Sequence, residues 1–214
     1  LDLPGAVVAV VSDAEAAIAA LNRETRPELS PLARLLLRTE SIASSKVEGL
    51  QVGSRSLARA EAQEATGRRI GAEAAEVIGN IDAMQFAIEE ASADEVTPST
   101  FVEIHRTLMR RAPNAGVAGK IRTSQGWIGG NDYNPCGAAY VPPPEDEIEA
   151  LLVDLAGFCE RDDLSPLVQA ALAHAQFETI HPFPDGNGRT GRAVIHVILR
   201  RRSLAPSFVP PVSV

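Results

Sequence analysis

Apolar residues recur along most of the chain at the three- and four-residue spacing of amphipathic helices, whereas the alternation typical of strands is scarce. Two kinds of start signal open these stretches: a capping box, and an N-cap residue followed by proline at the first helical position. The capping box is Ser12 with Glu15, and the N-cap pairs are Ser30-Pro31, Thr97-Pro98 and Ser165-Pro166. The pattern predicts helices at 12–21, 30–49, 77–88, 97–108, 148–155 and from 165 onward.

The pattern changes between Lys120 and Pro144, where a centre rich in glycine and asparagine separates two short arms. The arms are Trp127-Ile128 and Tyr140-Val141, and they predict a β-hairpin. We therefore expect an all-α bundle with one β-hairpin. Three domains or segments are expected: an N-terminal helical segment at 1–70, a core at 71–203, and a proline-containing tail at 204–214 that resembles a linker to a further domain.

Composition limits the classes of function. With 214 residues, 45% of them hydrophobic, the chain can bury one sizeable core. Its apolar stretches, such as Val7 to Val11, look far shorter than the roughly 20 residues of a membrane span, so we expect no membrane partner. A net charge of -8 argues against a broad nucleic-acid surface. Cys136 and Cys159 show no metal spacing, and a reducing cytoplasm is expected.

The chemistry concentrates in one segment, HPFPDGNGRTGR, which runs from His181 to Arg192. Its glycines allow backbone N–H groups to approach phosphate oxygens closely, and the helix expected to begin near Asn187 adds its positive dipole end. Arg189 and Arg192 are three residues apart, so both can project from one helical face toward phosphates. Asp185 suits Mg²⁺, and His181 suits a general base that acts on a hydroxyl.

The same letters also satisfy the dinucleotide fingerprint GxGxxG. That fingerprint needs a buried strand before it and a βαβ unit around it. Upstream, LVQAALAHAQFETI has helical spacing, and two prolines separate it from the glycines. A Rossmann turn is therefore not expected here.

The segment resembles the Fic-family signature HxFx(D/E)GNGRxxR, and every specified position is filled. The WIGG and YVPPP arms resemble the Fic flap, and the segment LLRTESIASSKVEGL resembles the N-terminal region of two-domain Fic proteins. Nearly the whole chain is covered. The resemblance implies an enzyme that transfers AMP from ATP to a Tyr, Thr or Ser hydroxyl of a protein and releases pyrophosphate.

The resemblance also implies a role for each position. His181 would deprotonate the target hydroxyl, Asp185 would ligate Mg²⁺, and Phe183 would anchor the loop. The flap would cover the nucleotide and pair its main chain with an extended target segment. The nucleotide-binding residues would be Asp185, Gly186, Asn187, Gly188, Arg189, Thr190, Gly191 and Arg192, with Ile128, Gly129 and Gly130 of the flap.

Position 188 bears on which group is transferred. The Doc-type kinases of the family carry lysine where this chain has Gly188, so the glycine favours AMP transfer over phosphorylation. Other relatives transfer phosphocholine or UMP, and transfer of another nucleotide stays open. De-AMPylation in the same pocket and a module that only senses ATP are further alternatives. The intact His181 argues against the sensor, because a sensor needs no base.

A second motif concerns control. Ser44, Glu48 and Gly49 match the family's inhibitory pattern (S/T)xxxE(G/N). Ser44 and Glu48 share a helical face, and Glu48 is expected to contact Arg192 and so to misplace ATP. The alternative is that Glu48 is a solvated helix end beside a glycine C-cap.

Other polar residues have plainer interpretations. His105, His174 and His196 are expected to be packed or hydrogen-bonded core histidines rather than ligands. Trp127 is equally consistent with target binding and with hairpin packing. The pattern does not decide whether the chain forms a homodimer.

Overall fold

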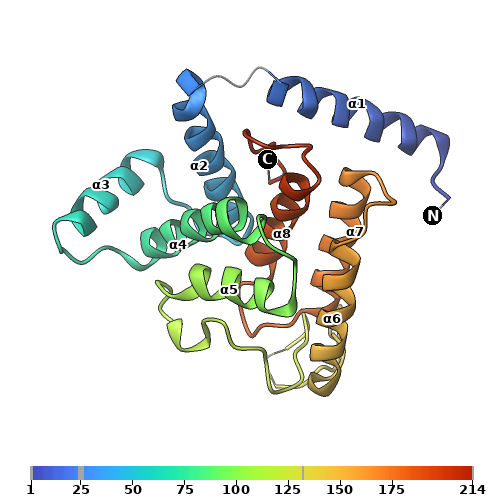
Figure 1. Cartoon of the computed structure of the whole chain (residues 1–214). Helices are drawn as coiled ribbons and strands as arrows, with labels where there is room; N and C mark the ends of the chain where they lie inside the picture. The colour runs from blue at the N-terminus through green and yellow to red at the C-terminus, as the bar shows by residue number, and fades with distance from the viewer. Residues whose placement is uncertain (1, 24–26, 132, 214) are drawn as a thin grey trace.

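The computed structural model describes residues 2–23, 27–131 and 133–213, and these residues are mostly helical (Figure 1). The α-helices are α1 (Gly5–Arg23), α2 (Ser30–Val47), α3 (Ser54–Ala65), α4 (Ala72–Phe86), α5 (Pro98–Met109), α6 (Ile148–Cys159), α7 (Pro166–Ile180) and α8 (Asn187–Arg201). A π-helical turn, η2 (Ala87–Ala91), extends α4. Three short 3₁₀ turns complete the elements: Pro27–Leu29, Ala115–Val117 and Glu145–Glu147.

Helix α8 lies at the centre of the bundle, in contact with α7, α5, α4 and α2 (Figure 1). Its apolar side chains belong to the main core, together with Phe101 of α5 and Phe177 of α7, which are both fully buried. A smaller core between α3 and α4 includes Leu57 and Val77. The HPFPDGNGRTGR segment begins directly after α7 and continues into the first turns of α8.

The helix boundaries test the start signals. Thr97 forms the expected cap of α5, with a reciprocal capping box to Thr100, and Ser165 caps α7 through its hydroxyl. Helix α2 begins at Ser30 itself, with Leu29 as an N-cap that makes no side-chain bond, so the predicted cap role of Ser30 is wrong. The predicted end of α2 at Gly49 is confirmed, because this glycine has φ +84° and terminates the helix.

Helix α1 begins at Gly5 and not at Ser12, because the carbonyl of Pro4 already accepts the first helical N–H groups and no helix breaker follows. By length and composition alone it is apolar enough to cross a membrane, which corrects the expectation that every apolar stretch is far too short. It lies near the N-terminus with few buried side chains. The carboxylate of Glu15 anchors it to α7 by accepting bonds from the Ser165 hydroxyl and the Leu167 N–H.

The C-terminal segment after α8 packs back onto the bundle. Phe208 and Val209 are buried, and the side chain of Asn22 accepts the main-chain N–H of Phe208 at 2.8 Å. Further along, Glu40 of α2 is 2% exposed and accepts the N–H of Val212 at 3.0 Å. Two polar side chains from α1 and α2 therefore hold this segment.

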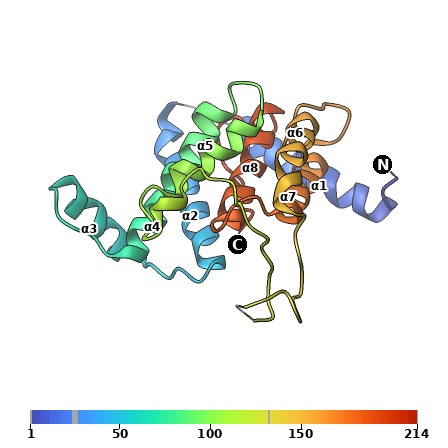
Figure 2. The same cartoon turned by 90° about the horizontal axis from the view of Figure 1, so that it is seen from below.

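The connection between α5 and α6 extends away from the helical body (Figure 2). The predicted hairpin arms meet at one antiparallel bridge, Ile128 with Tyr140, and the described residues form no β-strand. The Ile128 N–H donates to the Tyr140 carbonyl at 2.8 Å, and the Ala139 N–H donates to the Ile128 carbonyl at 2.8 Å. We refer to residues 124–131 and 133–143 as the flap.

Candidate active site

The loop between α7 and α8 is closed by Asn187. Its side-chain oxygen accepts the Phe183 N–H at 2.9 Å, and its amide donates to the Phe183 carbonyl at 2.8 Å. Phe183 is 1% exposed and stacks on the ring of His105, with the centroids 3.8 Å apart. The phenylalanine is thus the buried anchor that was expected for the loop.

His105 of α5 supports the same loop through hydrogen bonds and through its stacking on Phe183. Its Nδ1 accepts the Gly119 N–H at 3.0 Å, so its Nε2 carries the proton and donates to the Asp185 carbonyl at 3.0 Å. Burial lowers the pKa of His105 to about 4, so the ring is neutral at physiological pH. The prediction of a hydrogen-bonded core histidine is confirmed for His105.

His181 terminates α7 in the left-handed conformation, with φ 48°. Burial lowers its pKa below the ordinary value of 6.5, against a smaller opposing effect of the Glu178 main chain. The Glu178 carboxylate lies 3.9 Å from Nδ1 of His181 and also 3.9 Å from Nδ1 of His174. Burial raises the pKa of Glu178 and lowers that of His174. The imidazole of His181 is therefore largely neutral at pH 7 and available as a base.

Helix α8 starts directly after the loop, with Gly186 as its N-cap at φ 76°. This backbone conformation favours glycine, and a Cβ atom there would also be tight, at 3.0 Å from the sulfur of Met109. The first N–H groups of a helix lack intrahelical partners and carry the positive end of its dipole. The start of α8, at Asn187 and Gly188, is therefore suited to bind an anion.

Arg192 is held by α2. Its Nε donates to the Ser44 hydroxyl at 2.8 Å, and its Nη2 donates to the Ser44 carbonyl at 2.9 Å and to Oε1 of Glu48 at 2.7 Å. A Cβ atom at Gly188 would collide with this Glu48 oxygen. The Glu48 carboxylate thus lies against the start of α8 while it pairs with the arginine.

Arg189 has a different environment. It is 4% exposed, and its Nη1 lies 3.3 Å from the carboxylate of Glu76 on α4. The two motif arginines therefore contact different helices, although their spacing placed them on one helical face. Arg192 contacts the C-terminal end of α2, whereas Nη2 of Arg189 lies 3.9 Å from the carboxylate of Asp185 in the loop.

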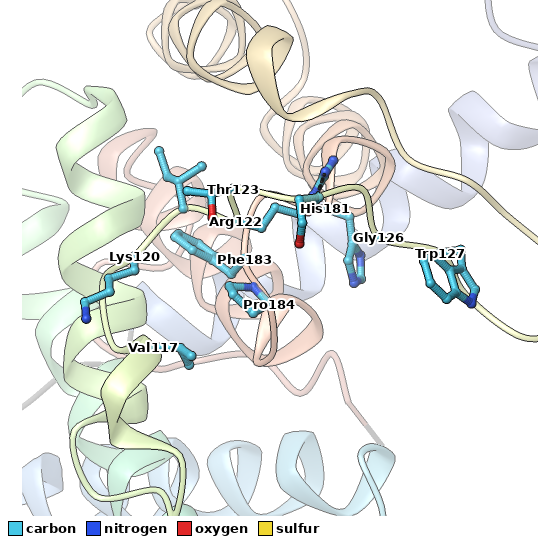
Figure 3. A pocket seen from close by; sticks show the side chains of 11 residues that line it. Val117, Lys120, Arg122, Thr123, Gly126, Trp127, His181, Phe183 and Pro184 are labelled. Carbon is cyan, nitrogen blue, oxygen red and sulfur yellow. Dashed lines mark hydrogen bonds between the residues drawn. The ribbon is translucent and has the colours of Figure 1, made fainter. Parts of the chain in front are cut away.

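A cavity of about 440 Å³ lies between the base of the flap and the loop. His181, Phe183 and Pro184 line it from the loop, Arg122 lines it from the chain leading into the flap, and Trp127 lines it from the flap itself (Figure 3). The indole of Trp127 is half-buried and donates to the Asn131 carbonyl at 2.7 Å. His181 is therefore open to a volume large enough for part of a substrate.

The Fic/DOC family sequence model matches residues 95–199, and the model of the Fic/DOC family N-terminal region matches residues 8–89. The chain belongs to the Fic/DOC family. The solved structure of a Fic family protein from Desulfovibrio desulfuricans is similar, with 28% identity, a TM-score of 0.70, and coverage of 96% of this chain and 61% of that one. Fic-1 from Caenorhabditis elegans shares the fold, with 24% identity, a TM-score of 0.70, and coverage of 91% and 58%.

Curated relatives of this Fic chain carry the name protein adenylyltransferase. Protein adenylyltransferase fic-1 of Caenorhabditis elegans is 32% identical over 138 residues, which is 63% of this chain and 26% of that protein. Protein adenylyltransferase Fic of Nematostella vectensis is 29% identical over 139 residues, which is 63% of this chain and 30% of that protein. The chain thus spans about a quarter to a third of the length of these relatives.

In this Fic chain, the loop and α8 bring together the residues that the signature singled out. Thr190 and Gly191 lie within α8 and are buried, and a Cβ atom at Gly191 would lie 2.7 Å from Oε1 of Glu178. In the flap, Gly129 and Gly130 have φ values of 76° and 77°, which glycine adopts without strain.

The carboxylate of Asp185 is fixed by two hydrogen bonds. Oδ1 accepts the Gly186 N–H at 2.6 Å, and Oδ2 accepts the Asn114 side-chain amide at 2.9 Å. Across the part of the chain that the structure describes, no group of three His, Cys, Asp or Glu side chains is arranged to hold a metal. Asp185 is 49% exposed, and Mg²⁺ is commonly bound through one or two carboxylates with phosphate oxygens and water. The residue therefore fits a magnesium site that the substrate completes.

Three supporting residues were missed from the sequence. Asn114 orients Asp185, Glu178 faces His181, and Glu76 neutralises Arg189. Only Glu178 could have been found from the sequence, because His174, Glu178 and His181 have the spacing of residues that share one helical face. The other two come from separate elements, and only the fold brings them to the site.

Proposed function

We propose that this chain transfers AMP from ATP to a Tyr, Thr or Ser hydroxyl of a target protein and releases pyrophosphate. One observation carries the proposal: a loop closed by hydrogen bonds of Asn187 joins the half-buried imidazole of His181, whose pKa burial lowers, to the start of α8, which is suited to bind an anion. The names of the curated relatives support AMP as the group transferred. Gly188 supports it further, because the lysine of the Doc-type kinases is absent from that position.

In the proposed reaction, His181 accepts the proton of the target hydroxyl. The target hydroxyl attacks the α-phosphorus of ATP, its proton moves to His181, and the bond from the α-phosphorus to the bridging oxygen of pyrophosphate breaks. The N–H groups at the start of α8, at Asn187 and Gly188, stabilise the negative charge that grows on the phosphoryl oxygens. Glu178 lies on the Nδ1 side of His181 and favours the protonated ring that results.

The charge of the outer phosphates needs separate partners. Asp185 would hold Mg²⁺, which supplies positive charge beside the phosphates when it is bound. Arg192 would hold the terminal phosphate by a charge-assisted contact. The Asp185 side chain is 49% exposed, whereas that of Arg192, which pairs with Glu48, is 11% exposed.

Glu48 is proposed as a brake on this reaction. It occupies the side chain of Arg192, and its carboxylate lies against Gly188, where phosphate oxygens would approach. A negative charge at that place repels phosphate and keeps Arg192 turned toward α2. ATP would therefore be held in a poor geometry until Glu48 moves.

The flap is proposed to receive the target. Its two arms are nearly free of main-chain pairing with each other, which leaves backbone groups for an extended target segment. Ile128 is 42% exposed and Tyr133 is 91% exposed, so both side chains can make apolar contacts with the target segment. Recognition of this kind encodes little target sequence.

The decisive test is His181→Asn. Asparagine tolerates the left-handed conformation at this position, so the variant removes the base without straining the loop. We expect AMP transfer, measured with α-labelled ATP and cell lysate, to be lost, and ATP binding, measured by calorimetry, to be kept. Undiminished transfer by the variant would refute the mechanism.

A further inference from the structure

Arg122 lies at the base of the flap, beside the candidate base, and is 6% exposed. Its Nε donates to the His181 carbonyl at 2.9 Å, and its Nη1 donates to the Ser124 carbonyl at 3.0 Å. Its Nη2 donates to the Pro143 carbonyl and lies 3.5 Å from the Ile180 carbonyl. One guanidinium therefore joins both ends of the flap to the residue that ends α7.

Among the described residues, the two ends of the flap make no main-chain hydrogen bond with each other. Prolines occupy 142, 143 and 144, and proline has no N–H to donate to a ladder. In place of a ladder, the Gln125 side-chain amide donates to the Pro142 carbonyl at 2.8 Å. This pair lies one residue further into the flap than Ser124 and Pro143, which Arg122 contacts. Side chains thus replace main-chain pairing at the base of the flap, which also explains why the predicted hairpin is reduced to one bridge.

The end of α7 needs these donors. The last carbonyls of a helix lack intrahelical partners, and a positive charge there is favourable because it faces the negative end of the dipole. Arg122 supplies donors to Ile180 and His181, and the hydroxyl of Tyr140 donates to the Thr179 carbonyl at 2.7 Å. The flap therefore docks by capping the helix that ends at His181.

We propose that Arg122 is a positioning residue that sets the place of the flap relative to His181. Its planar fork reaches carbonyls on three segments at once, which a single ammonium does not reproduce. Without it, the flap ends separate from each other and from the loop, and the cavity beside His181 loses its fixed wall. The part of this inference that concerns catalysis rests on the proposed AMP transfer, whereas the part that concerns the flap does not.

The chain offers a direct readout, because Trp127 in the flap is its only tryptophan. The test compares Arg122→Met with Arg202→Met, a matched control at the end of α8. Arg202 also makes four hydrogen bonds, three of them to carbonyls, but in the loop at 161–164. Acrylamide quenching and anisotropy of Trp127 report flap mobility, and circular dichroism reports helix content.

We expect Arg122→Met to increase the quenching of Trp127 and lower its anisotropy at unchanged helix content, while Arg202→Met leaves both values as in the wild type. Misplacement of a reacting group by about 1 Å costs on the order of 100-fold, and we expect a loss of that size in kcat/KM for Arg122→Met. Arg122→Lys, which keeps the charge, should show a smaller effect of the same kind and serves if the methionine variant does not fold.

Unchanged Trp127 signals in the Arg122 variants, or an equal change in Arg202→Met, would overturn the proposal. A loosened flap with undiminished kcat/KM would overturn the catalytic part. If the wild-type chain transfers no AMP to any protein, the proposed function fails, and the Trp127 comparison still decides the role of Arg122 in the flap.

Discussion

Removing the Glu48 carboxylate should activate the enzyme, by an amount that the contacts of Arg192 limit. Glu48→Ala deletes one of the three hydrogen bonds that hold the guanidinium, and the two bonds to Ser44 stay. A hydrogen bond to a charged group contributes about 1.5–3 kcal/mol. Glu48 is 38% exposed, so solvent screening reduces the value to about 1 kcal/mol.

At about 1.4 kcal/mol per tenfold change, this loss corresponds to roughly fivefold faster AMP transfer. The carboxylate also lies against Gly188, and removing its charge adds to the effect. Ser44→Ala combined with Glu48→Ala should activate further, because Arg192 then loses two of its three contacts with α2.

The assay measures transfer from α-labelled ATP to lysate proteins and to the chain itself. Glu61→Ala is the matched control: Glu61 pairs with Arg38 across α2 and α3 and has nearly the same exposure, 37%. We expect no activation from it. A Glu48 variant no faster than the wild type, or an Arg192→Ala variant that is as active as the wild type, would refute the brake.

Three further outcomes are expected. Because burial lowers the pKa of His181, the acid limb of the plot of kcat/KM against pH should have its midpoint below pH 6.5, and activity should be lost as the pH drops through that pKa. A midpoint at pH 7 or above would contradict a neutral buried base. Asp185→Ala should lose most Mg²⁺-dependent turnover, with partial rescue by excess Mg²⁺, and a wild-type rate insensitive to EDTA would remove the metal from the scheme. His105→Phe keeps a ring against Phe183 but leaves the Gly119 N–H without its acceptor, so the free energy of unfolding should fall by about 1–3 kcal/mol in urea titrations; an unchanged midpoint argues against the support role of this ring.

The sequence predicts the helices better than their ends. Thr97 and Ser165 cap α5 and α7 as expected, because an N-cap followed by proline is a local signal. Ser12 misled because the same local pattern also fits the middle of a longer helix, and nothing in it reports that α1 starts at Gly5. Helix α3 was missed, since the small core that buries its Leu57 is completed by residues of α4 and of other segments.

The site shows the same division. The loop from His181 to Arg192 is contiguous, so one stretch of sequence specifies it, and the Glu48 contact with Arg192 was expected from a second motif. The hairpin was predicted from its glycines, but its prolines remove the donors that a ladder needs. Arg122 gave no signal, because its partners are main-chain carbonyls whose positions only the folded chain defines.

The left-handed backbone at His181 implies a trade between stability and activity. For residues other than glycine, that conformation costs roughly 1–2 kcal/mol, and most positions of this kind in proteins carry glycine or asparagine. Here a histidine stands at the end of α7 instead, as its proposed role as the base requires. Inactive chains with glycine at 181 should consequently tolerate higher temperature than the active form, and selection for thermal stability alone would tend to remove the base.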